Sequence, residues 1–203
     1  MSIADKLNTI AENEQLVYRA GQKLEYDKFW DRFQNNGNTR IYYYAFAYNR
    51  FNDTNYNPKY PINCSTPNTA AQQLFASSTS ITDTKVPIVI NGTNANAMFN
   101  GASNLVNIQE IEIKKANTTF NSTFTNCVAL VDITFTGLQI DNNIDFSYCS
   151  KLSDKSVDNI IEHLKNFNGT SGKTLTVHTD VYNRMVSDGR KILVENKNWT
   201  LKK

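Results

Sequence analysis

The chain has 203 residues, and a length prior of roughly 150 residues per domain predicts one domain with an appendage. Hydrophobic residues make up 40% of the chain and charged residues 20%, with 8 Gly and 4 Pro, which excludes disordered, collagen-like and disulfide-scaffold proteins. No apolar run approaches the ~20 residues that span a bilayer, so no membrane insertion is expected. The net charge of +2 comes without a basic stripe, so we expect no nucleic acid as partner.

Residues 1–34 are expected to form a helical segment for anchoring or oligomerisation. Four aliphatic residues recur at intervals of seven: Ile3, Ile10, Val17 and Leu24. Leu7 adds a second apolar position to the first heptad, but Glu14 and Gly21 stand where that position recurs. Two interpretations therefore stay open. The segment forms a coiled coil, such as a homotrimer, or it is an amphipathic helix that docks on another protein. Charged residues occupy the place of a signal-peptide core, so we expect no cleaved leader.

Residues 35–66 are expected to form an N-terminal cap with an aromatic strand. Within residues 40–50, alternation places four aromatic side chains on one strand face: Tyr42, Tyr44, Phe46 and Tyr48. This face either caps the segments that follow or forms a platform for a sugar or a protein, since Tyr offers a large area and a hydroxyl at low entropic cost. We favour the cap and keep the four residues as binding candidates.

An internal repeat occupies residues 67–152. Its four copies share a Phe, a small residue three positions later and an aliphatic residue six positions later. The Phe residues are Phe75, Phe99, Phe124 and Phe146, at intervals of 24, 25 and 22 residues. The small residues are Ser78, Ala102, Cys127 and Cys149, and the aliphatic ones are Ile81, Leu105, Leu130 and Leu152. A single copy cannot bury its apolar face, so we expect the copies to stack with Phe on Phe.

Short strands are expected after the aliphatic position, at residues 87–90, 110–113 and 132–135. The third copy, residues 124–135 with the sequence FTNCVALVDITF, resembles the F-x-x-C-x-x-L-x-x-I-x-I unit of Treponema-type (BspA-like) leucine-rich repeats. The resemblance implies an α/β fold, a short leucine-rich-repeat solenoid with an N-terminal helix and a helix-rich C-terminal cap. The register of residues 140–152 stays open.

Residues 153–203 are expected to form that C-terminal cap. An apolar stripe predicts a helix over 153–166 with Ser153 as its N-cap. A strand is expected at 174–178, a helix over 181–196 with a break near Gly189, and a closing strand at 199–201. Such a cap covers the open edge of stacked strands.

The N-terminal sequences IADKLNTIAENEQLVYRAG (residues 3–21) and EYDKFWDRFQNNGN (residues 25–38), followed by the Tyr-rich strand and degenerate repeats, resemble proteins encoded in phage and prophage tail regions of gut Firmicutes. This resemblance implies a virion or tail-associated attachment protein. Its expected location is the phage particle, or the cytoplasm before assembly. Its expected partners are other virion subunits and a host-surface ligand.

Motifs for metal binding, cofactors and nucleophilic catalysis are missing from the sequence. The two His and three Cys form neither C-x-x-C nor H-x-x-x-H, so we expect no metal site, no cofactor and reduced packing cysteines. Four acidic residues near predicted strands keep a glycan-cleaving enzyme as a third hypothesis: Glu110, Glu112, Asp132 and Asp145. The simpler interpretation of these carboxylates is that they are solvated.

If the expected strands form one row, their outward side chains make a short polar surface. Its candidate binding residues are Glu112, Lys114, Asp132, Thr134, Thr176 and His178. A row of this kind suits a modest protein or glycan contact. We therefore expect a non-catalytic recognition module, a virion attachment or structural protein that is not an enzyme. The alternative is an intracellular protein-interaction adaptor of prophage origin.

Overall fold

The computed structural model describes residues 45–48, 51–53, 56–58, 60–64, 71–170 and 172–203. The chain divides into two units, residues 1–39 and 40–203, and every described residue belongs to the second. The expected helix of residues 1–34 lies outside the described residues, as do Tyr42 and Tyr44.

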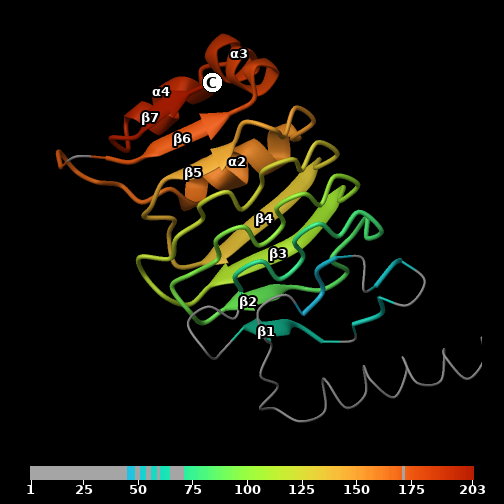
Figure 1. The fold of residues 1–203 in the computed structure, drawn as a ribbon. Coiled ribbons are helices and arrows are strands. Elements are labelled where there is room, and N and C mark those ends of the chain that lie inside the picture. Colours follow the sequence, from blue (N-terminus) through green and yellow to red (C-terminus); the bar gives the residue numbers. More distant parts are fainter. Residues whose placement is uncertain (1–44, 49–50, 54–55, 59, 65–70, 171) are drawn as a thin grey trace, which may run out of the picture. The chain divides into compact units, whose positions relative to one another are not determined.

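The described part is a mixed α/β structure with two parallel sheets (Figure 1). The first sheet contains, in chain order, β1 (Ile62–Cys64), β2 (Ile88–Ile90), β3 (Asn107–Ile113) and β4 (Asp132–Gly137). The second contains β5 (Ile144–Phe146), β6 (Thr174–Val177) and β7 (Thr200–Lys202). The helices are α2 (Asp154–His163), α3 (Thr179–Ser187) and α4 (Arg190–Glu195). The strands expected at 87–90, 110–113, 132–135, 174–178 and 199–201 are thus confirmed to within a few residues.

Stacked phenylalanine rings form the centre of the core. The expected contact of Phe on Phe is confirmed, with ring centroids 5.4 Å apart for Phe75 and Phe99, 6.0 Å for Phe99 and Phe124, and 4.4 Å for Phe124 and Phe146. Phe46 extends this Phe ladder at the other end, with its ring 5.0 Å from that of Phe75. All five rings are buried and stack nearly parallel, as offset aromatic pairs prefer.

The small residue three positions after Phe75, Phe124 and Phe146 is a buried hydrogen-bond donor, whereas Ala102, three positions after Phe99, is buried and has no side-chain donor. The Cys127 thiol donates to the carbonyl oxygen of Phe99 at 3.2 Å, and the Ser78 hydroxyl donates to that of Phe46. The Cys149 thiol makes a longer contact, 3.9 Å, with the carbonyl oxygen of Phe124. A small side chain with an O–H or S–H thus fits the core and links one segment to the one before it. The three cysteines are unpaired and buried, as expected for packing residues.

A bulge in β3 changes the register of the first sheet. Ile108 pairs with Ile133, but Ile111 pairs with Phe135, so β3 carries one more residue than β4 between these pairs. Glu112 therefore lies opposite Thr136 and not opposite Thr134. The outward row expected from the sequence is shifted at this point, because alternation alone gives no sign of an inserted residue.

Helix α2 ends the first sheet in place of a fifth strand. The Asn159 amide accepts a hydrogen bond from the N–H of Phe135 at 2.6 Å and donates to its carbonyl oxygen at 3.2 Å. The Ser156 hydroxyl accepts from the N–H of Ile133 at 3.0 Å. Side chains thus satisfy the backbone groups that an edge strand leaves open.

The chain then starts a second sheet over the Phe side of the stack. Phe146, at the end of β5, rests on Phe124, and β5 pairs with β6 and not with β4. The expectation of a single row of strands is therefore wrong. This also settles the register that the sequence left open, because Ile144 and Phe146 face inward and Asp145 faces outward.

Polar contacts hold the C-terminal helices against the rest. Ser153 is the N-cap of α2, as expected, and Gly189, at φ 85°, separates α3 from α4. The Lys197 ammonium donates to three carbonyl oxygens at the C-terminal end of α2, at 2.7, 2.8 and 3.0 Å. Arg190 binds both carboxylate oxygens of Asp158, at 2.6 and 3.0 Å, and so joins α4 to α2.

Candidate ligand-binding groove

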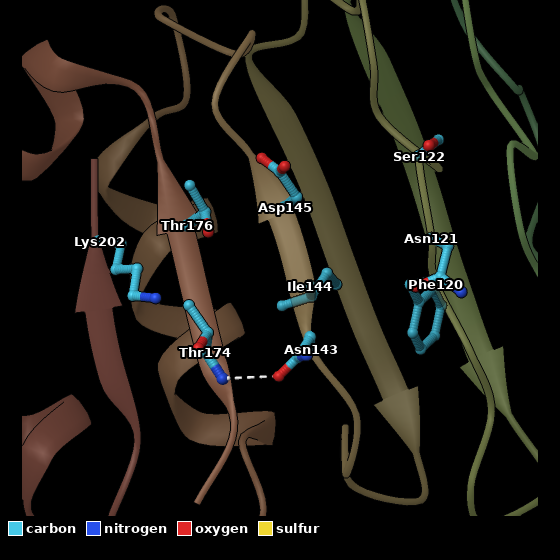
Figure 2. A pocket seen from close by; sticks show the side chains of 9 residues that line it. All are labelled: Phe120, Asn121, Ser122, Asn143, Ile144, Asp145, Thr174, Thr176 and Lys202. Carbon is cyan, nitrogen blue, oxygen red and sulfur yellow. Dashed lines mark hydrogen bonds between the residues drawn. The ribbon is translucent and has the colours of Figure 1, made fainter.

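A groove of about 390 Å³ lies over the outer face of the second sheet (Figure 2). Its lining comes from all three strands of that sheet and from the segment that precedes β4. The lining residues are Phe120, Asn121, Ser122, Asn143, Ile144, Asp145, Thr174, Thr176 and Lys202. Polar side chains dominate this set, and volumes of a few hundred Å³ are typical of small-molecule sites.

Strand register aligns the central residues of the groove. Asp145 on β5 pairs with Thr176 on β6, and Thr176 pairs with Lys202 on β7. Paired residues of a sheet share a face, so the three side chains project to the same side of it. Neighbouring strands lie about 4.8 Å apart, which gives a row roughly 10 Å long. The alternate residues of the strands, such as Leu175 and Val177, are buried on the opposite face of the sheet and hold the row in place.

Two hydrogen bonds orient polar groups at the edge of the groove. The Asn143 amide oxygen accepts from the N–H of Thr174 at 2.9 Å, and Figure 2 shows this contact between the two segments. One carboxylate oxygen of Asp145 accepts from the N–H of Ser147 at 2.7 Å, a short turn that restrains the side chain. Both residues are therefore positioned before any ligand arrives.

The charge of the groove is balanced. Asp145 is the only carboxylate and Lys202 the only ammonium among the lining residues. Hydroxyl groups come from Ser122, Thr174 and Thr176, and amides from two asparagines. The surface therefore offers many hydrogen bonds and little net field, so it favours neither polyanions nor polycations.

Of the described residues that were expected to bind, Thr176 alone lines the groove. Glu112 on β3 forms an ion pair with Lys114, which follows the strand, and Asp132 accepts a hydrogen bond from the Ser153 hydroxyl at 2.7 Å, next to α2. Thr134 is half-buried on β4, in the first sheet. The structure thus divides the expected row between two sheets and does not gather it into one site.

His178 and the described aromatic candidates have other places. His178 is the N-cap of α3, where its Nδ1 accepts from the N–H of Asp180 at 3.2 Å. Phe46 is fully buried in the Phe ladder, so its assignment to a binding surface is wrong, and residues 45–48 form a turn where a strand was expected. Tyr48 is exposed and has a left-handed backbone, with φ 58°. Alternation could not reveal this, because Phe46 and Ala47 are both buried.

Lys202 and Asn143 were not among the site residues expected from the sequence. Asp145, Thr176 and Lys202 each lie on the same face of their sheet, away from the buried residues of their strands. Alternation within each strand could therefore indicate that these side chains face outward. The pairing of β5 with β6 and of β6 with β7 was needed to bring them together, and the paired residues are 31 and 26 positions apart in the chain.

The four acidic residues considered for catalysis are divided between the two sheets, and in the first sheet Glu110 and Glu112 both lie next to Thr136. Glu110 accepts from the Thr136 hydroxyl at 2.5 Å in the first sheet, whereas Asp145 lies in the second. Within the described residues, no three His, Cys, Asp or Glu side chains form a group that could hold a metal ion. Burial raises the pKa of the Cys64 and Cys127 thiols to about 12 and raises that of Cys149 as well, so these thiols are poor nucleophiles at neutral pH.

The described part of the chain contains no helix long and apolar enough to cross a membrane. Comparisons with known proteins found no matching family model, no matching curated protein and no matching solved structure.

Proposed function

We propose that the chain is a short leucine-rich-repeat solenoid of the Treponema type that acts as a non-catalytic recognition module. The groove on the second sheet carries this proposal, since three neighbouring strands and the segment at residues 120–122 turn polar side chains toward one concave surface. In repeat folds, stacked segments create binding surfaces that no single segment could form.

The spacing and geometry of the Phe ladder support the solenoid assignment. The residue two positions after the Phe has a left-handed backbone in four segments: Tyr48 at φ 58°, Ser77 at 56°, Gly101 at 78° and Asn126 at 60°. Backbone hydrogen bonds join equivalent positions, such as Phe75 N–H to the Met98 carbonyl at 2.7 Å and Phe99 N–H to the Thr123 carbonyl at 3.0 Å. Recurring geometry at a period near 25 residues is typical of leucine-rich repeats.

Recognition fits the groove better than hydrolysis. Glycoside hydrolysis uses two carboxyl groups on either side of the scissile bond. Asp145 is the one carboxylate of the groove, and its oxygen is engaged by the backbone of Ser147. The balanced set of amide, hydroxyl and charged groups suits binding of a polar ligand in its ground state.

We place this module in a phage or prophage particle, with residues 1–34 attaching it to other subunits, or forming a trimer, and the groove facing a host-surface ligand. The resemblance of residues 3–21 and 25–38 to tail-region proteins supports this role. The second candidate, an intracellular adaptor of prophage origin, shares the recognition module and differs in where the chain resides.

Particle purification tests the role. Cultures that carry the gene are induced to lyse, particles are banded by density, and the chain is detected with an antibody. We expect it in the particle band at a constant ratio to the major tail protein. Recovery of the chain in the soluble fraction alone contradicts the particle role and favours the adaptor.

A Thr176→Arg variant tests the groove by filling it with a long side chain. Thr134→Arg is the matched control, a half-buried threonine in the middle of β4 in the other sheet. Adsorption of the purified protein to host cells is expected to fall for Thr176→Arg and to persist for Thr134→Arg. The reverse pattern contradicts recognition through this groove.

A further inference from the structure

We propose that the groove on β5, β6 and β7 binds a neutral saccharide. This inference rests on the proposed function, and it specifies the chemical class of the ligand. Its basis is the row formed by Asp145, Thr176 and Lys202, with the amides and hydroxyls around it.

The hydrogen-bonding groups of the row match those of a sugar ring. Each sugar hydroxyl both donates and accepts, and a carboxylate can accept from two neighbouring hydroxyls at once. Asp145 offers such an acceptor, Lys202 offers donors about 10 Å away, and the Thr176 hydroxyl lies between them and can do either. A ligand that presents hydroxyls along its length can use all three.

The surroundings of the row extend this pattern. The Asn143 oxygen is occupied by the N–H of Thr174, and among the described contacts its amide nitrogen makes no hydrogen bond, so the amide offers donors to a ligand. Asn121 and Ser122 add groups of both kinds from the far side of Asp145, and Figure 2 shows them across the groove from β6. Phe120 contributes an apolar edge to the lining.

Other ligand classes fit less well. An acidic polymer or a phosphorylated ligand needs several cations, and Lys202 is the only one in the lining, with Asp145 opposing it. An apolar ligand would leave the carboxylate, the ammonium and the hydroxyls without partners after desolvation, which is costly. A neutral, polyhydroxylated ligand avoids both penalties.

A direct binding experiment tests the inference. The full chain is titrated by calorimetry with neutral tetrasaccharides built from glucose, mannose, galactose and N-acetylglucosamine. Tetragalacturonic acid and a heparin tetrasaccharide serve as acidic counter-probes. We expect binding of at least one neutral tetrasaccharide, with a Kd in the roughly micromolar to millimolar range and weaker binding of the acidic probes.

Variants then locate the binding. Asp145→Asn keeps the shape and the hydrogen bond from Ser147 and removes the charge, so we expect affinity to fall roughly tenfold. Thr176→Arg is expected to abolish binding, and Thr134→Arg in the first sheet to preserve it. Failure of all four neutral tetrasaccharides, preference for an acidic probe, or affinity unchanged by Thr176→Arg each overturns the inference.

The outcomes separate this inference from the proposed function. If no neutral saccharide binds while Thr176→Arg still reduces adsorption to cells, the ligand is of another class and recognition stands. If saccharide binding depends on Asp145 while the chain is missing from particles, the groove inference stands and the particle role fails.

Discussion

Asn159 occupies the place where the next strand would pair with β4, and Asn159→Leu tests whether one amide closes the sheet. In the native protein this amide serves both the N–H and the carbonyl oxygen of Phe135, at 2.6 and 3.2 Å. Leucine has a similar size and a higher helix propensity than asparagine, so α2 itself is not weakened. The substitution removes two hydrogen bonds and leaves both backbone partners without replacements.

The expected loss follows from these two groups. An unsatisfied buried donor or acceptor costs about 1–3 kcal/mol, so the two together predict a fall in unfolding free energy of about 2–6 kcal/mol. Ser156→Ala removes the acceptor for the Ile133 N–H together with a donor to the Val131 carbonyl oxygen, which also accepts from the N–H of Ser153, and is expected to cost about 1–3 kcal/mol. Asn159→Asp keeps the acceptor and loses the donor, so its effect lies between the native protein and Asn159→Leu.

Urea unfolding followed by circular dichroism measures these differences. Asn183→Leu is the matched control, since Asn183 is an exposed asparagine on α3. We expect the control to unfold at the native urea concentration or slightly above it. An Asn159→Leu variant as stable as the control would refute the conclusion that this side chain closes the edge of β4.

Three further predictions follow from the described contacts. An added Cβ at Gly137, where φ is 77°, would lie 2.4 Å from the carbonyl oxygen of Ile113, whereas at Gly101 its nearest neighbour, in Ser77, is 3.4 Å away. Gly137→Ala is therefore expected to lower the unfolding free energy by about 1–3 kcal/mol more than Gly101→Ala, and equal losses in urea unfolding would contradict the clash. Burial raises the pKa of Cys127 to about 12, so a disulfide reagent at mild alkaline pH should label the native thiols slowly and the urea-unfolded thiols at once; rapid labelling of the native protein would argue against their burial. The hydrogen bond from Arg190 lowers the pKa of Asp158, so the stabilising contribution of this pair is present above the ordinary aspartate pKa and is lost as the pH falls through the lower folded value. The unfolding free energy should thus fall less steeply with acidification in Asp158→Asn than in the native protein, and identical slopes would refute this role.

The high asparagine content has a structural explanation that composition alone did not supply. Asparagine makes up 28 of the 203 residues, and many of its side chains bind backbone or side-chain groups of a neighbouring segment. Asn96 accepts from the N–H of Asn121, and Asn142 donates to the carbonyl of Thr118. Asn107 donates to Asp83 in the same way. Where turns of chain stack without regular pairing, such side chains satisfy polar groups that water no longer reaches.

Much of the fold was determined locally. The recurrence of Phe, a small residue and an aliphatic residue predicted the stacked core. Each segment must bury one apolar face against its neighbours, so the buried residues recur at equivalent positions of every segment. Alternation predicted β2, β3, β4, β6 and β7, though not β1 or β5, and the apolar stripe with Ser153 predicted α2. These features depend on nearest neighbours in the chain, so a single sequence is enough to reveal them.

Tertiary structure decided the register and the site. The extra residue in β3, the closing of β4 by Asn159 and the start of a second sheet at β5 all depend on partners about 24–31 residues away. Phe46 joined the core because its ring stacks on Phe75, whereas alternation grouped it with three tyrosines as either a cap or a binding face. The groove exists because Asp145, Thr176 and Lys202 meet across three strands, and only the pairing of distant segments can place them together.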